Sequence, residues 1–146
     1  MSLEGGCFCG RLRYRLEGEP DDANYCHCRM CQRVAGAPVV AWGTWPADRF
    51  AWLAGTPAVL ASSPRAQRLF CRDCGTHVLF REERTPQKVD VALATLDEPG
   101  RFAPTAHYWT SSAIPWCAPH DDLPRYREGS LAEHVRSKAR SADSKA

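Results

Sequence analysis

The sequence predicts a mainly β fold: packed antiparallel sheets of short strands with few short helices. Short runs of alternating apolar and polar residues recur along the chain, and helical periodicity is scarce. The 10 glycines and 11 prolines break these runs at frequent intervals, as in all-β domains. With 146 residues, the chain can build one real hydrophobic core. We expect one domain over residues 1–129 and a polar tail or short helix over residues 130–146.

The first predicted strand is RLRYRLE, residues 11–17. In an extended chain, Leu12, Tyr14 and Leu16 share one face, and charged residues occupy the other face. GEPDD, residues 18–22, then ends the strand as a turn. The same reasoning predicts short strands over residues 37–43, 49–55, 57–63, 66–70, 77–81, 88–96 and 105–109.

Helix signals occur at two places. MCQRVAG, residues 30–36, predicts one or two helical turns that end at Gly36, because glycine adopts the left-handed conformation of helix ends. SLAEHVRSKAR, residues 130–140, carries a capping-box pattern with Ser130 at the cap and Glu133 three residues later. Its few apolar residues predict a frayed helix or a tail.

Composition excludes some classes of protein. The sequence has no run of 18 apolar residues and no secretory signal, so we expect a cytoplasmic protein that does not bind membranes. The formal net charge of +2 would fall to about −1 if seven cysteines bound two zinc ions as thiolates. Nucleic acid is therefore not the expected partner. We interpret the stripe Arg11, Arg13 and Arg15 as a solvated sheet face.

Eight cysteines could form disulfides or metal sites. A reducing cytoplasm disfavours disulfides, whereas C-x-C and C-x2-C spacings present two sulfurs to one metal. Seven cysteines fall into three clusters, Cys7-x-Cys9, Cys26-x-Cys28-x2-Cys31 and Cys71-x2-Cys74, and Cys117 stands alone.

CRDCGTH, residues 71–77, is typical of a zinc knuckle at a hairpin tip. It lies between two predicted strands, and Gly75 can adopt the positive φ that the tight turn needs. A knuckle supplies two ligands, and CFCG, residues 7–10, offers two more. We therefore predict a closed, structural zinc site with the ligands Cys7, Cys9, Cys71 and Cys74.

The remaining cluster has three cysteines, and three protein ligands are typical of catalytic zinc with an open fourth position. In an extended chain, Cys26 and Cys28 point to one side and His27 to the other, so we do not expect His27 to be a ligand. Three thiolates weaken the Lewis acidity of zinc and favour a soft fourth ligand. We predict that Cys26, Cys28 and Cys31 act in catalysis through bound zinc and that a small thiol fills the open position.

Alternatives remain for several residues. Cys117 or a histidine could complete the triplet as a second structural site, and iron could replace zinc. We interpret Trp109 and Trp116 as core or cleft-wall residues. His27, beside two cysteines, is the best catalytic candidate among four histidines that we interpret as surface or core residues: His27, His77, His107 and His120.

Stretches across residues 5–127 resemble the glutathione-dependent formaldehyde-activating enzyme family, which includes centromere-protein-V-like members. Seven cysteines stand in register with family-like sequence around them. The stretches are GGCFCGRLRYRLEGEP, YCHCRMCQRVAGAP, GTPAVLASSPRAQRLFCRDCGTHV, VALATLDEPG and HYWTSSAIPWCAPHDDLPRY.

The resemblance implies a zinc-stapled β fold, sometimes called a β-tent, with two zinc ions per chain. It implies carbon–sulfur lyase chemistry, which makes or breaks the bond between a thiol such as glutathione and an aldehyde carbon. It also implies structural zinc on Cys7, Cys9, Cys71 and Cys74 and catalytic zinc on Cys26, Cys28 and Cys31. The alternative class is a non-catalytic zinc module that binds protein or nucleic acid, and the oligomeric state is left open.

Overall fold

The computed structural model describes residues 1–129, and within them the protein is mainly β, as predicted. The predicted tail or helix over residues 130–146 lies outside this part of the chain. Two compact units form within the described part: Met1–Ala23 with Ala41–Pro104, and Asn24–Val40 with the described residues from Thr105 onward. None of the described helices is both long and apolar enough to cross a membrane.

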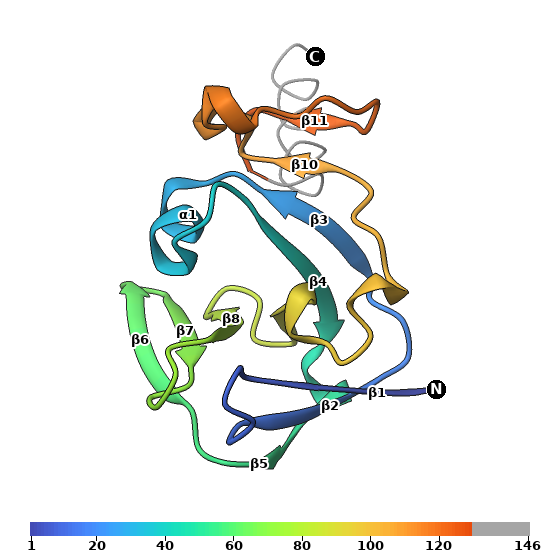
Figure 1. The fold of residues 1–146 in the computed structure, drawn as a ribbon, viewed down its shortest axis with the longest axis vertical. Helices are drawn as coiled ribbons and strands as arrows, with labels where there is room; N and C mark the ends of the chain where they lie inside the picture. The colour runs from blue at the N-terminus through green and yellow to red at the C-terminus, as the bar shows by residue number, and fades with distance from the viewer. Residues whose placement is uncertain (130–146) are drawn as a thin grey trace, which may run out of the picture. The chain divides into compact units, whose positions relative to one another are not determined.

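The first unit contains a small antiparallel sheet of three strands (Figure 1). β2 lies in the middle and pairs with β1 on one side and β5 on the other. The alternation predicted for its sequence is confirmed, because Leu12, Tyr14 and Leu16 are buried. The three strands are β1 (Ser2–Gly6), β2 (Arg13–Glu17) and β5 (Phe50–Ala54).

Five further strands of the first unit pair antiparallel in the order β4-β9-β8-β7-β6. Apolar side chains from these strands and from the small sheet form one core, in which Trp45 and Val91 are fully buried. The Trp45 indole N–H donates to the Gly18 carbonyl at 3.1 Å, so its one polar atom is satisfied. The strands are β4 (Val40–Pro46), β9 (Lys88–Ala92), β8 (His77–Glu82), β7 (Ala66–Phe70) and β6 (Ala58–Ser63).

The second unit is built around β10 (His107–Tyr108), which lies between β3 (Asp22–Cys26) and β11 (Arg125–Tyr126). Both pairings are parallel, in contrast to the antiparallel strands of the first unit. Helix α1 (Arg29–Ala35) follows β3 after two residues. Short 3-10 turns at Thr110–Ser112 and Pro115–Cys117 follow β10.

The predicted helix over residues 30–36 is confirmed: α1 ends at Gly36, which has a left-handed φ of 62°. The predicted strand over residues 88–96 is too long, because the chain leaves β9 at Ala92 and enters a 3-10 turn, Leu93–Thr95. Three strands were not predicted: β1, β3 and β11.

Candidate metal centres

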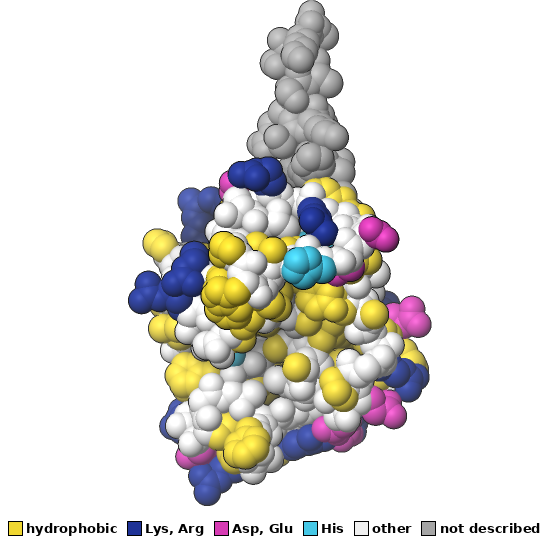
Figure 2. Space-filling view, turned by 45° about the horizontal axis from the view of Figure 1, so that its top comes forward, with side chains coloured by type: hydrophobic (Ala, Val, Ile, Leu, Met, Phe, Trp, Pro, Cys, Tyr) yellow, Lys and Arg dark blue, Asp and Glu magenta, His cyan; other side chains and the backbone are white. Residues whose placement is uncertain are grey.

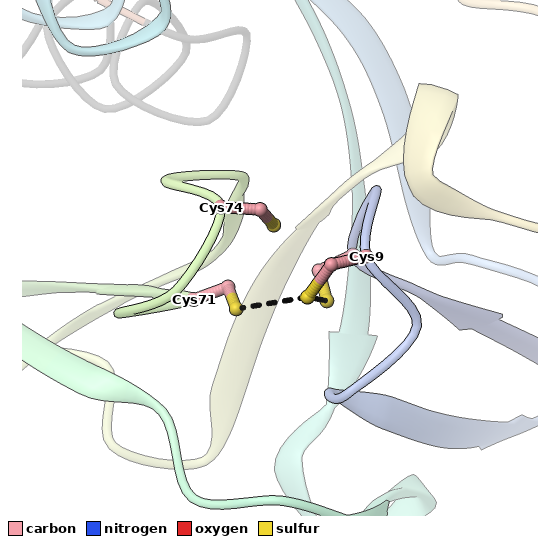
Figure 3. Close-up of side chains that lie close together, drawn as sticks. Cys9, Cys71 and Cys74 are labelled. Atoms are coloured by element: carbon pink, nitrogen blue, oxygen red, sulfur yellow. Dashed lines mark hydrogen bonds between the residues drawn. The ribbon is translucent and has the colours of Figure 1, made fainter.

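Four cysteines of the first unit form one cluster, with their sulfur atoms all within 4.8 Å of one another. The Cys9 sulfur lies 3.5 Å from that of Cys7 and 3.7 Å from that of Cys71. Figure 3 shows Cys9 and Cys71 turned toward each other, with Cys74 on the same loop as Cys71. These are the four residues that the spacing predicted as a closed site: Cys7, Cys9, Cys71 and Cys74.

Two hairpin turns present these sulfurs. Cys7 and Cys9 lie between β1 and β2, and Cys71 and Cys74 lie between β7 and β8. The turns are built alike: the N–H of Gly10 donates to the Cys7 carbonyl, and the N–H of Gly75 donates to the Cys71 carbonyl. Both glycines have a φ of 79°, which few other residues adopt without strain. A C-x-C or C-x2-C pair followed by glycine therefore predicts both turns.

Thr76 connects the two turns and was missed from the sequence. Its hydroxyl oxygen accepts the Phe8 N–H at 3.1 Å and lies 3.2 Å from the Cys74 sulfur. The hydroxyl and backbone hydrogen bonds from Thr76 lower the pKa of the Cys74 thiol to about 5. Cys74 is thus prepared as a thiolate, the form that binds metal.

The second cluster contains the predicted triplet, again with all sulfurs within 4.8 Å of one another. Cys26 is the last residue of β3, Cys28 caps α1, and Cys31 lies in the first turn of that helix. The Cys31 N–H donates to the Cys28 sulfur at 3.3 Å. Cys26 and Cys31 are buried, whereas Cys28 is half-buried. The strand-to-helix junction therefore brings three sulfurs together without any distant residue.

The triplet fits a cation on chemical grounds. The nearby Cys28 and Cys31 thiols raise the pKa of Cys26, and burial raises it further. Three sulfurs this close cannot all become thiolates unless a positive charge offsets their repulsion. A soft divalent metal such as zinc supplies that charge, and thiolates are its preferred ligands. Both clusters could therefore hold a metal ion.

The geometry supports neither Cys117 nor a histidine as a fourth ligand of the triplet. Cys117, in the 3-10 turn Pro115–Cys117, belongs to neither cluster of the described residues. The histidines of this part of the chain also lie outside both clusters, although His27 stands between Cys26 and Cys28 in the sequence. The described residues thus offer the triplet three protein ligands.

His27 and His107 form a buried hydrogen-bonded pair in the second unit. His27 Nε2 lies 2.8 Å from His107 Nδ1, and His107 Nε2 lies 2.9 Å from Asp121 Oδ2. Burial lowers the pKa of His27, and the neighbouring His107 lowers it further. No pattern in the sequence indicates this pairing, because 80 residues separate the histidines and neither occurs in a motif that pairs them.

The remaining histidines and tryptophans named from the sequence lie outside the two cysteine clusters. His77 is buried, with its ring edge-on to Trp42 at 5.1 Å between ring centres, and His120 is exposed. Trp109 and Trp116 are not core residues, because their relative exposures are 38% and 75%. Trp109 has a φ of 58°, the single positive φ among the described non-glycine residues, so β10 ends in a strained turn.

The three arginines of the stripe, Arg11 just before β2 and Arg13 and Arg15 on β2, form ion pairs. Arg13 pairs with Asp97 through two hydrogen bonds of 2.8 and 2.5 Å, and Arg11 lies 3.0 Å from Asp73. Arg15 lies 3.2 Å from Glu4. Both basic and acidic side chains occur around the margin of the face drawn in Figure 2. This pattern agrees with a solvated sheet face.

Comparisons with known proteins place the chain in one family. The model of one family, described as glutathione-dependent formaldehyde-activating enzyme, matches residues 2–112, which include all seven clustered cysteines. An uncharacterized lyase of Schizosaccharomyces pombe is 29% identical over 77 residues, which cover 53% of this chain and 56% of the yeast protein. The match thus spans just over half of that relative.

A crystal structure of a Rhodobacter sphaeroides protein has the same fold. It superposes with a TM-score of 0.52 and 23% sequence identity, over 64% of this chain and 87% of the other. At this identity the likeness supports the fold alone.

Proposed function

This chain belongs to the glutathione-dependent formaldehyde-activating enzyme family, and on that premise we propose that it is a zinc-dependent carbon–sulfur lyase. Its substrate would be the adduct of an aldehyde with a small thiol, glutathione or a similar molecule. The observation that carries the proposal is the contrast between two cysteine clusters, one with four sulfurs and one with three. The yeast relative that is named a lyase supports the same reaction class.

Each cluster would hold one zinc ion. Cys7, Cys9, Cys71 and Cys74 would form the closed structural site. Cys26, Cys28 and Cys31 would form the catalytic site, where zinc supplies an open position that accepts the substrate sulfur as a thiolate. The half-buried Cys28 would mark the side from which substrate enters, because Cys26 and Cys31 are buried.

The proposed reaction is an addition and its reversal, and it is balanced without an oxidant. In the forward direction, the thiol sulfur forms a bond to the aldehyde carbon, and the thiol proton ends on the former carbonyl oxygen. In the lyase direction, the carbonyl re-forms, the carbon–sulfur bond breaks with its electron pair going to sulfur, and the hydroxyl proton returns to that sulfur as the thiol proton. Cys26, Cys28 and Cys31 would fix the reacting sulfur in place, which removes much of the entropic cost of the addition.

We also propose that the protein works in the reducing cytoplasm, where the substrate thiol and the eight cysteines stay reduced.

A binding module for nucleic acid has less support. Such a module needs a surface of one sign, because phosphate contacts provide most of its affinity. The arginines of the β2 stripe are instead paired with carboxylates: Arg11 with Asp73, Arg13 with Asp97 and Arg15 with Glu4.

Exchange spectroscopy by NMR tests the activity. The rate of exchange between free formaldehyde and its glutathione adduct is measured with and without the zinc-loaded protein. We expect the wild type to raise this rate by at least about 100-fold, in the range usual for positioned catalysis. Cys28→Ser should return the rate to the uncatalysed value, keep the fold and bind one metal ion instead of two.

Cys117→Ser is the matched control, since it also exchanges a cysteine for serine but lies outside both clusters. It should keep two metal ions and full activity. The proposal fails if the wild type with two zinc ions leaves the exchange rate unchanged, or if Cys28→Ser is as active as the wild type.

A further inference from the structure

Three side chains of the second unit form a hydrogen-bonded row. The row ends at a residue that lies, in the sequence, between two of the proposed ligands. Asp121 contacts His107 Nε2 with both carboxylate oxygens, at 3.0 and 2.9 Å, and His107 Nδ1 lies 2.8 Å from His27 Nε2. His27 and His107 are 2% and 5% exposed, so water does not compete for the bond between the two rings. His27 lies between Cys26 and Cys28 in the chain.

The row fixes where the protons lie when both rings are neutral. The Asp121 carboxylate can only accept, so His107 Nε2 must carry a hydrogen. His107 Nδ1 is then an acceptor, and His27 Nε2 must donate to it. The remaining His27 nitrogen, Nδ1, is left as a bare lone pair, and none of the described residues donates to it. Asp121 thus sets the tautomer of the His27 ring through two successive hydrogen bonds, with His107 between them.

The backbone of His27 is held as firmly as its ring. Its N–H donates to the Tyr108 carbonyl at 2.9 Å, and its carbonyl accepts the Gln32 side-chain amide at 2.8 Å. The same Gln32 amide donates to the Ser112 carbonyl at 3.0 Å, and Gln32 is buried. Every polar group of His27 except Nδ1 therefore has a fixed partner, and the Cys26–Cys28 backbone is fixed with it.

Asp121 is anchored at its own end of the row. Its carboxylate accepts the Leu123 N–H at 3.1 Å, and its carbonyl accepts the Arg125 guanidinium at 2.8 Å. The His107 N–H donates to the Pro124 carbonyl at 2.8 Å, so the same loop also holds the strand that carries His107. Residues 121–125 therefore form a support for His107 and, through it, for His27.

We infer that Asp121 and His107 are positioning residues for the three-cysteine metal site: they orient His27 and thereby hold Cys26 and Cys28 in ligand geometry. This inference rests on the proposed function, because it needs a metal on the triplet. Metal–sulfur bonds tolerate errors of about 0.2 Å, so a backbone that is fixed before binding raises affinity. Asp121 lies beyond residues 2–112, and the family match says nothing of it.

The first test compares two isosteric substitutions in the full chain loaded with cobalt(II). Asp121→Asn weakens the row, whereas Asp122→Asn removes the same charge from the next, exposed residue. We expect Asp121→Asn to shift the sulfur-to-cobalt absorption bands of the three-sulfur site. It should also release one of its two metal ions to a chelating dye about 10- to 100-fold faster, the usual effect of losing a group that orients ligands. Asp122→Asn should behave as the wild type.

The second test reads the tautomers directly. The ring nitrogen NMR shifts of the wild-type zinc protein should show the hydrogen on Nε2 in both His27 and His107. A hydrogen on His27 Nδ1 would overturn the inference, because Asp121 would then not set the tautomer.

The release experiment separates three outcomes. Faster loss of one metal ion in Asp121→Asn alone supports the inference. Unchanged bands and release in Asp121→Asn refute it, and so does equally faster loss of both metal ions, which indicates a general loss of stability. A wild type that holds only one metal ion refutes the proposed function itself, so the two failures are distinguishable.

Discussion

Tyr14 illustrates how burial controls a single side chain in the first unit. It is completely buried, its ring stacks on Phe50 at 5.4 Å, and its hydroxyl lies 2.8 Å from the Thr95 hydroxyl. The Thr95 hydroxyl donates to the Ala92 carbonyl, so Tyr14 is the donor in its bond to Thr95. Burial and the charge of Asp97 raise the pKa of Tyr14 to about 12, against about 10 in an unfolded chain.

This raised pKa predicts a loss of stability in alkali. Because the folded pKa exceeds the unfolded one, the contribution of the neutral phenol is complete below about pH 10 and is lost as the pH rises toward 12. The loss is on the order of 2–3 kcal/mol in the free energy of unfolding. Phenolate absorbance should show a titration step near pH 12, and Tyr14→Phe should lack that step. A folded wild type without a step near pH 12, or a Tyr14→Phe protein that keeps it, would contradict the assignment.

The cysteine clusters could be predicted from the sequence because each ligand group is local. Cys26, Cys28 and Cys31 lie at one strand-to-helix junction, and each half of the four-cysteine cluster lies in one hairpin turn. The row from Asp121 through His107 to His27 could not be predicted, because its members come together only when β10 pairs with β3. Thr76 was missed for a related reason: its bond to Phe8 spans 68 residues.

At the scale of elements, the antiparallel hairpins formed by β6, β7 and β8 were the most predictable part of the fold. β7 and β8 have nearly the predicted limits, because alternating side chains and the glycine turn between them point to the same structure. β3, β10 and β11 were predicted poorly or not at all. β10 and β11 have two residues each, and parallel pairing between distant segments leaves no turn signal in the sequence.

The four-cysteine cluster should be essential for folding of the first unit. Cys71 is 1% exposed and lies at the β7–β8 turn. Metal binding at such a site contributes directly to the free energy of folding, on the order of 10 kcal/mol. Because Cys71→Ser removes a ligand, the free energy that it costs should exceed the stability of the folded unit. Near-ultraviolet circular dichroism should show lost aromatic packing. Cys117→Ser should keep the wild-type spectrum and melting temperature. A folded Cys71→Ser protein with an unchanged melting temperature would refute the structural role.

At the scale of the whole molecule, two units each carry one cluster: four sulfurs in the first and three in the second. The core of buried apolar residues belongs to the first unit. The second unit relies on short parallel strands, one helix and buried polar groups such as Gln32, His27 and His107. We infer that this division lets one cluster stabilise the fold while the other serves chemistry.

Zinc X-ray absorption tests the central claim of one closed and one open site most directly. The wild type loaded with two zinc ions should show an average of about 3.5 sulfur ligands per zinc without thiol, and about 4 at saturating glutathione. Cys28→Ser, which should keep only the closed site, should show about 4 under both conditions. A wild type with 4 sulfurs per zinc before thiol is added, or one that stays at 3.5 at saturating thiol, would contradict the account.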